Sequence, residues 1–523
     1  MRFPRSSGIL LHPTSLPGPW GIGDLGPAAY SFVDFLHAAG QSLWQILPLG
    51  PTGYGDSPYQ CFSAFAGNPL LISLDALIQK GLLGYDEVVS AAAERHLSLD
   101  TVHYGEVMEF KLPLLWRAYE RMQEGAIPEV GEAFQTFKHD HAAWLDDYAL
   151  FMALKDAHGG QPWNSWEPAL RQRDPDALAQ ARQAHARAID WQQFLQFLFF
   201  RHWARLKAYA NEHGIKIIGD APIFVAFDSA DVWAHQQRFF LDAHGNPSVV
   251  AGVPPDYFSP TGQRWGNPLY RWSTMASDGY AWWVARLRAS FSQVDILRLD
   301  HFRGFAAYWE VPATEETAMN GRWVKGPGAD LFAHLERALG HLPIIAEDLG
   351  LITPDVHALR DQFDFPGMKV LQFAFGEPEN PYLPHYHVPN CVVYTGTHDN
   401  NTSVGWFQDL SEPEREQVRA YLGRDGADIA WDLIRLALMS VADLAIVPFQ
   451  DVLRLGADAR MNTPGHLGQN WAWRFRSEAL NEGLAGGLRF LTAIYDRLPA
   501  ALKPVRAAEE EEAEELAYNP VEV

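Results

Sequence analysis

The chain has 523 residues, of which 47% are hydrophobic and 20% charged, a composition typical of globular proteins and unlike that of disordered or collagen-like chains. Its 64 acidic residues outnumber 41 Lys plus Arg and give a net charge of -23, which disfavours nucleic acid and anionic membranes as partners. Two cysteines, Cys61 and Cys391, without CxxC neighbours, exclude a disulfide framework.

The N-terminal stretch MRFPRSSGILLHP has too short an apolar core for a signal peptide, and no later apolar run is long enough to span a bilayer. Together with the low cysteine content, this predicts a cytoplasmic protein with no membrane anchor. The sequence indicates no obligatory protein partner.

The motif GIGDLG, residues 21–26, matches the GxGxxG pattern and precedes a helix-like stretch from Pro27 to Ala39. A dinucleotide site requires a strand that runs directly into the glycines and an acidic residue that closes the next strand. Here HPTSLPGPW precedes the glycines, and the next strand ends in ILPLGP. We therefore interpret the motif as a loop.

Two strands are predicted next, Gln41 to Leu47 and Leu70 to Leu74, separated by a long loop rich in Gly, Tyr, Ser and Asp. Long ordered loops often carry function. Tyr54 and Tyr59 in this loop are candidate platforms for a ligand. The alternative is that both rings only pack against the loop.

From about residue 76 to 211, apolar residues recur at spacings of three and four, which predicts a large helical insertion. Within it, an aromatic stripe that includes Phe194, Phe197 and Trp203 is interpreted as core.

After the insertion, short apolar strands alternate with helical stretches, a pattern typical of βα units around a parallel sheet. With the two N-terminal strands the count reaches about eight, which predicts an α/β protein with a (β/α)8 TIM barrel. A doubly wound open sheet is the alternative. The predicted division is a barrel from 1–75 and 212–506, the insertion 76–211, and an acidic, disordered tail 507–523. The later strands are predicted at 215–220, 294–300, 343–348, 368–375, 391–397 and 444–449.

Four acidic residues, Asp220, Asp300, Glu347 and Asp399, each lie at or just after the C-terminal end of a different predicted strand. In a barrel these strand ends meet at one mouth, whereas an open sheet would spread them along an edge. The sequence therefore predicts a site at which several carboxylates converge.

The stretch VDILRLDHFRG, residues 294–304, shows how such a site could work. Arg298 and Asp300 are two apart and share one face of the strand, so the cation can hold the carboxylate ionised as a nucleophile. Glu347 follows an apolar run and precedes Asp348, and desolvation with a like charge would raise its pKa, as a general acid requires. His398 and Asp399 are candidates for gripping sugar hydroxyls.

Converging carboxylates can also bind a hard cation or form a structural ion-pair network. A magnesium site is disfavoured because the loops are short of phosphate-handling glycines and lysines. Glycosidic-bond chemistry, with one ionised and one protonated carboxyl group, fits the pattern best. No metal site is predicted.

Five strings, GPTGYGDSPYQ, VDILRLDHFRG, IIAEDLG, TGTHDNN and AGVPPDYFSPTGQRWGNPLY, resemble those of the 4-α-glucanotransferases (amylomaltases), relatives of the α-amylases. The resemblance runs to about Ala500. It implies that Asp300 is the nucleophile, Glu347 the general acid/base and Asp399 the transition-state stabiliser. It also implies sugar contacts by a second group of residues: Asp220, Arg298, His398, Tyr59, Tyr257, Trp265 and Asn470.

The resemblance implies a barrel without the C-terminal β-sandwich of α-amylases, and no cofactor. The expected activity is retaining transfer of α-1,4-glucan segments from a donor maltooligosaccharide or starch to the 4-hydroxyl of an acceptor glucan or glucose. An α-glucan hydrolase is the alternative. A non-catalytic starch-binding protein is a third possibility, although it would not need all three acids.

Overall fold

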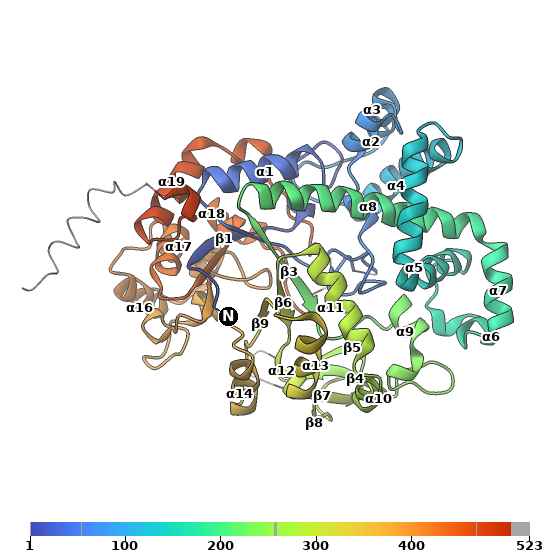
Figure 1. Ribbon diagram of the computed structural model, residues 1–523. Helices are drawn as coiled ribbons and strands as arrows, with labels where there is room; N and C mark the ends of the chain where they lie inside the picture. Colours follow the sequence, from blue (N-terminus) through green and yellow to red (C-terminus); the bar gives the residue numbers. More distant parts are fainter. Residues whose placement is uncertain (1, 54, 256–258, 467, 504–523) are drawn as a thin grey trace, which may run out of the picture.

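The computed structural model describes residues 2–53, 55–255, 259–466 and 468–503, and Figure 1 shows its central parallel strands flanked by helices. Eight parallel strands form one sheet in the order β10-β11-β12-β1-β2-β3-β6-β9. The two ends of this sheet meet, because Ala346 N in β9 donates a 3.0 Å hydrogen bond to Pro366 O, just before β10. The predicted (β/α)8 barrel is confirmed. Its strands are β1 (Ser6–Leu10), β2 (Leu43–Gln45), β3 (Lys216–Pro222), β6 (Ile296–Asp300), β9 (Ile344–Ala346), β10 (Gly367–Val370), β11 (Cys391–Tyr394) and β12 (Leu444–Pro448).

Seven of the eight predicted strands coincide with strands of the structure, although the one predicted at 368–375 ends at Val370 and is followed by a 3-10 helix, and one prediction is wrong. The segment Leu70 to Leu74 belongs to a 3-10 helix, Pro69–Leu71, and to the start of α2. Side chains cap both turns, since Asn68 accepts from Leu70 N and Ser73 accepts from Ala76 N. The eighth strand is instead β1, which the sequence did not indicate.

The barrel interior is filled by side chains that point inward from alternate positions of the strands, as in other barrels of this type. This inner cluster includes Leu10, Leu43, Ile218, Ile296 and Tyr394. A larger cluster packs between the outer face of the strands and the helices. The inward row of β6 continues from Ile296 through Arg298 to Asp300, so the site residues extend the same alternation.

Helices surround the barrel in a ring of neighbours, in which α13 contacts α11, α11 contacts α8, α8 contacts α1, α1 contacts α19, and α19 contacts α17. The predicted helix after GIGDLG is confirmed as α1, and GIGDLG itself is a loop. The helix bounds outside the insertion are α1 (Pro27–Ala38), α9 (Ala230–Ala234), α10 (Trp272–Ser277), α11 (Ala281–Gln293), α12 (Arg303–Ala306), α13 (Ala329–Leu339), α14 (Pro354–Gln362), α15 (Ser403–Asp409), α16 (Glu412–Leu422), α17 (Ile429–Met439), α18 (Phe449–Val452) and α19 (Glu482–Ile494).

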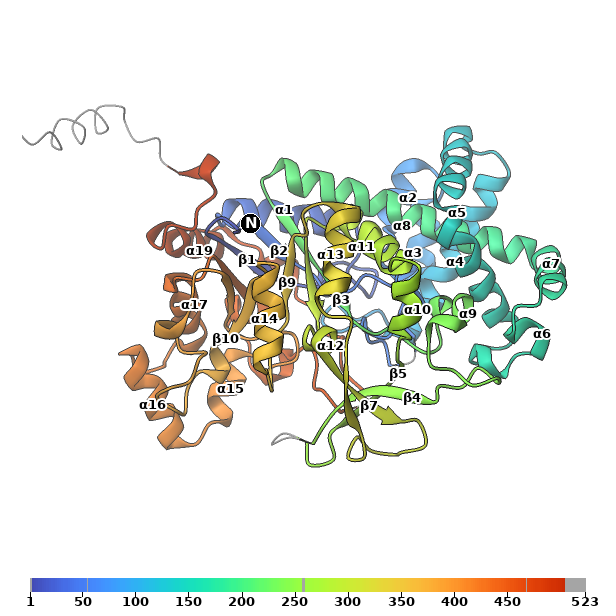
Figure 2. The same cartoon turned by 60° about the horizontal axis from the view of Figure 1, so that its bottom comes forward.

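The range 76–211 is helical, and Figures 1 and 2 show these helices gathered on one side of the barrel. Phe194, Phe197 and Trp203 of its aromatic stripe are buried in the core. Where this unit ends stays a prediction, because α8 also packs against the barrel helices α1 and α11. The bounds are α2 (Leu74–Lys80), α3 (Tyr85–Ala93), α4 (Tyr104–Gln123), α5 (Pro128–Ala157), α6 (Pro168–Arg171), α7 (Pro175–Ala184) and α8 (Ala186–Glu212).

A second, antiparallel sheet was not predicted. Its strands pair in the order β5-β4-β7-β8 and lie below the barrel in Figure 2. Within residues 249–272, where the sequence gives no strand signal, β4 and β5 pair in antiparallel orientation. The bounds are β4 (Val249–Val253), β5 (Gln263–Pro268), β7 (Ala307–Pro312) and β8 (Arg322–Lys325).

Both cysteines are free thiols, as expected. Among the described residues, no helix has the length and apolar character needed to cross a membrane. The predicted acidic tail, 507–523, lies outside the described residues.

Candidate active site

Strand pairing brings the central ion pair together. The register between β3 and β6 sets Asp220 directly opposite Arg298. Arg298 Nη1 donates to both carboxylate oxygens of Asp220, at 2.9 and 2.7 Å, and Nη2 lies 3.0 Å from Asp300 Oδ1. The side chain of Asp220 is 0% exposed and that of Asp300 is 29% exposed. Arg298 therefore links a buried carboxylate to one that is open to the mouth of the barrel.

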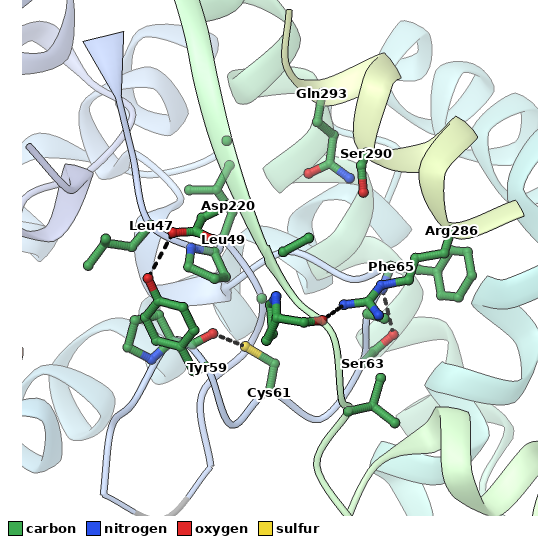
Figure 3. A pocket seen from close by; sticks show the side chains of 18 of the residues that line it. Leu47, Leu49, Tyr59, Cys61, Ser63, Phe65, Asp220, Arg286, Ser290 and Gln293 are labelled. Atoms are coloured by element: carbon green, nitrogen blue, oxygen red, sulfur yellow. Dashed lines mark hydrogen bonds between the residues drawn. The ribbon is translucent and has the colours of Figure 1, made fainter. Parts of the chain in front are cut away.

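Tyr59 adds a second contact to Asp220. Its hydroxyl donates to Asp220 Oδ2 at 2.9 Å, and Figure 3 shows the two side chains pointing toward each other. Burial, together with the charge of Asp220, raises the pKa of Tyr59, so the phenol remains a hydrogen-bond donor. The ring of Tyr59 also stacks on His398, with 5.1 Å between centroids.

Glu347 follows β9, the next strand of the barrel after β6. Its two carboxyl oxygens accept hydrogen bonds from His301 N at 2.7 Å and Leu349 N at 2.8 Å. Burial raises the pKa of Glu347, and the charge of Asp300 raises it further, against the opposing effects of Arg298 and the two amides. The bond to His301 ties Glu347 to the residue directly after Asp300.

Asp399 and His398 lie in the loop that follows β11. Asp399 Oδ1 accepts a 2.6 Å hydrogen bond from Asn462 Nδ2, and His398 Nε2 lies 3.4 Å from the same oxygen. Arg460 Nη2 donates to the backbone oxygen of Asp399 at 2.6 Å. The side chain of Asp399 remains 46% exposed. These contacts therefore fix its position and leave part of the carboxylate accessible.

Some of the predicted site residues line a cleft of about 280 Å³, whereas Asp220, Arg298 and Glu347 are not among its lining residues. Trp265 meets the ring of His301 edge to face, with centroids 4.8 Å apart. Burial lowers the pKa of His301 to about 4, so the ring is neutral, and its buried Nε2 has no hydrogen-bond partner among the described residues. The predicted site residues that line the cleft are Tyr59, Trp265, Asp300, His398 and Asp399.

Asn470 has a different place. Its side chain accepts from Thr463 N at 2.9 Å and donates to His466 O at 2.9 Å, so it braces its own loop. It lines a neighbouring groove of about 890 Å³ instead of the cleft. Two other predicted contacts, Tyr54 and Tyr257, lie outside the described residues.

Sequence reasoning missed several residues of the cleft. Asn462 and Trp471 come from a segment without a strand signal, and His301 directly follows Asp300 without a pattern of its own. Gln263 and Asn267 lie on β5, whose short polar sequence resembles a loop. Only proximity in the fold identifies these five as lining residues.

The arrangement suits acid–base and nucleophilic chemistry on a neutral ligand. It offers a carboxylate held by a cation, a second carboxyl group whose pKa is raised, and aromatic rings at the cleft wall. Among the described residues, no group of three or more His, Cys, Asp or Glu side chains is arranged to hold a metal ion.

Comparisons with known proteins identify the family of this chain. The family model described as 4-alpha-glucanotransferase matches residues 11–480. The chain is 51% identical to a 4-alpha-glucanotransferase of Thermus thermophilus over 507 residues, covering 95% of this chain and 100% of the relative. It is 52% identical to one of Synechocystis sp. over 500 residues, covering 94% and 98%.

Among solved structures, the amylomaltase from Streptococcus agalactiae in complex with acarbose superposes with a TM-score of 0.92 at 39% identity. That match covers 95% of this chain and 100% of the other. Family model, sequence and fold therefore agree over nearly the whole chain, which belongs to the 4-alpha-glucanotransferase family.

Proposed function

We propose that this enzyme transfers α-1,4-glucan segments by a retaining double displacement, from a donor maltooligosaccharide or starch to the 4-hydroxyl of an acceptor glucan or glucose. The observation that carries the proposal is the contrast between two neighbouring carboxyl groups. Asp300 is held by Arg298 at 3.0 Å, whereas burial and the charge of Asp300 raise the pKa of Glu347.

In the first step, Asp300 attacks C1 of the donor glucose, and the bond from C1 to the leaving O4 breaks. Glu347 gives its proton to O4, so the donor's reducing-end segment leaves as a neutral alcohol. The product is a glycosyl ester on Asp300. Arg298 stays paired with Asp220 throughout, so its position does not depend on the charge of Asp300.

In the second step, the acceptor 4-hydroxyl attacks C1, Glu347 takes the hydroxyl proton, and the ester bond to Asp300 breaks. Asp399 lies open in the cleft and would stabilise the positive charge that develops on the sugar ring. His398 and Tyr59, which stack on each other, would contact the donor sugar, and the buried Asp220 would support them by fixing the Tyr59 hydroxyl.

The test is to trap the intermediate. The wild-type enzyme is quenched during turnover of maltotriose and digested, and the peptides are weighed by mass spectrometry. We expect a glycosyl addition on the peptide that contains Asp300. Asp300→Asn should lose this addition and nearly all turnover while it still binds oligosaccharide, because an amide is nearly isosteric but a poor nucleophile.

Asp140→Asn is the matched control, because Asp140 is exposed on α5, away from the cleft. An addition on a different residue would overturn the assignment. So would an Asp300→Asn variant that keeps more than about a tenth of the wild-type rate.

A further inference from the structure

Trp323 is unusual among the 19 tryptophans of this chain. All of them fall within the described residues, and Trp323 is the most exposed, with 43% of its surface open to solvent. An exposed aromatic ring gives up part of the stabilisation that burial in the core would provide. Packing in the core therefore does not explain the presence of a tryptophan at this position of β8.

The ring is held in place from one side. The guanidinium carbon of Arg303 lies 3.9 Å from the ring centroid, and Trp309, paired with Trp323 across β7 and β8, meets it at 5.2 Å and 68°. Trp309 is itself fixed, since its Nε1 donates to Ala318 O at 2.9 Å. Arg303 therefore lies over the ring and Trp309 packs against it at a steep angle, while 43% of the residue stays exposed.

This ring lies beside the catalytic loops. Arg303 follows Asp300 by three residues, and its guanidinium donates to the backbone oxygen of Leu351. Leu351 follows Glu347 by four residues, a span of at most ~14 Å, and its side chain is 64% exposed. Arg303 thus connects the exposed Trp323 ring to the loop that follows Glu347.

We propose that Trp323 is a stacking platform for the glucan segment on the Glu347 side, which is the leaving segment in the first step and the acceptor in the second. This rests on the proposed function, because it takes Glu347 as the group that protonates the leaving oxygen. A pyranose ring presents a flat face of C–H bonds that packs on an aromatic face, and a neutral glucan meets no repulsion from a chain of charge -23.

A simpler role for Trp323 would be to cover Arg303. That role needs only the contact with Arg303, and it does not account for the 43% of Trp323 that stays exposed. The platform also predicts something that a cover does not, namely a dependence on glucan length. Short substrates end before they reach Trp323, and long ones extend over it.

The test compares kcat/KM for amylose and for maltotriose in Trp323→Ala and wild type. We expect the ratio of amylose to maltotriose values to fall about fivefold to tenfold, the size expected for one lost stacking contact. Trp323→Phe keeps a flat ring and should restore most of the ratio. Tyr85→Ala removes another exposed ring, 62% exposed on α3, and should leave the ratio unchanged.

Trp323→Leu, which keeps an apolar cover over Arg303 without a flat face, gives the same readout if Trp323→Ala does not fold. An equal loss on both substrates, or no loss on either, would overturn the platform. A wild-type enzyme that makes no product longer than its donor would instead contradict the proposed function. The two failures are therefore distinguishable.

Discussion

The role of each carboxylate in the site depends on its contact with Arg298 and on its burial. Asp220 is enclosed, bound twice by the guanidinium and once by Tyr59, so it acts as a fixed counter-charge. Asp300 receives the other end of the same guanidinium and faces the cleft. Glu347 accepts hydrogen bonds from the amides of His301 and Leu349, and burial together with the charge of Asp300 raises its pKa in spite of them.

The raised pKa of Glu347 predicts a pH dependence. In the proposed first step Glu347 must be protonated, so kcat/KM should fall as the pH rises through the pKa of Glu347, at a higher pH than an ordinary glutamate would give. Burial also makes the ionised form unfavourable in the folded state. The wild type should therefore lose stability as the pH rises from the ordinary value of ~4.3 through the raised pKa of Glu347.

Chemical denaturation of wild type and Glu347→Gln between pH 4 and pH 8 tests whether stability falls with rising pH because of Glu347. The difference in free energy of unfolding should shift in favour of the variant as the pH rises, with Glu336→Gln on the exposed face of α13 as control. A difference that is independent of pH, or that shifts the other way, would refute the assignment.

The position of Trp265 leads to a prediction about the ratio of hydrolysis to transfer. Its ring lies at the cleft wall against His301, where it can align an acceptor sugar and keep water from C1. Trp265→Ala should raise the ratio of hydrolysis to transfer several-fold, measured as new reducing ends per glucan transferred. Trp265→Phe keeps a ring and should lie nearer to wild type. An unchanged ratio in the alanine variant would mean that the ring only packs the loop.

Among the elements, strands that carry apolar runs between loops could be predicted from the sequence, and β1 could not. β1 reads SSGIL, which has too few β-branched and aromatic residues to signal a strand. It forms because two parallel neighbours, β12 and β2, supply its hydrogen bonds. The opposite error at Leu70 to Leu74 arose because a short buried helical run is as apolar as a strand.

Close packing explains why β1 contains Gly8. A Cβ atom at this position would lie 2.3 Å from Leu43 O in the neighbouring strand, so Gly8→Ala must push β1 and β2 apart. We expect a loss of about 3 kcal/mol in the free energy of unfolding, the upper end for overpacking. Gly131→Ala in α5, where nothing lies within 4 Å, should instead stabilise by about 0.5 to 1 kcal/mol.

Thermal and urea unfolding of both variants measure this difference. Equal stabilities for Gly8→Ala and wild type would mean that the strands are not packed as tightly as the backbone positions indicate.

For the whole molecule, the site could be predicted because a barrel gathers its strand ends at one mouth. Asp220, Asp300, Glu347 and Asp399 could be predicted because each lies at or just after the C-terminal end of a strand. It could not find Asn462 or Trp471, which reach the cleft through irregular chain, nor the antiparallel sheet that carries Trp323. Those placements depend on tertiary packing, which leaves no periodic pattern in the sequence.

The central claim is that the enzyme transfers glucan segments much more often than it hydrolyses them. The most direct test is to incubate it with maltotriose alone and to follow both product sizes and reducing ends. In the proposed mechanism, each glycosyl-enzyme intermediate reacts either with a sugar hydroxyl or with water. The account predicts a ladder of longer maltooligosaccharides together with glucose and little net gain in reducing ends. A steady rise in reducing ends, with no product longer than maltotriose, would contradict it.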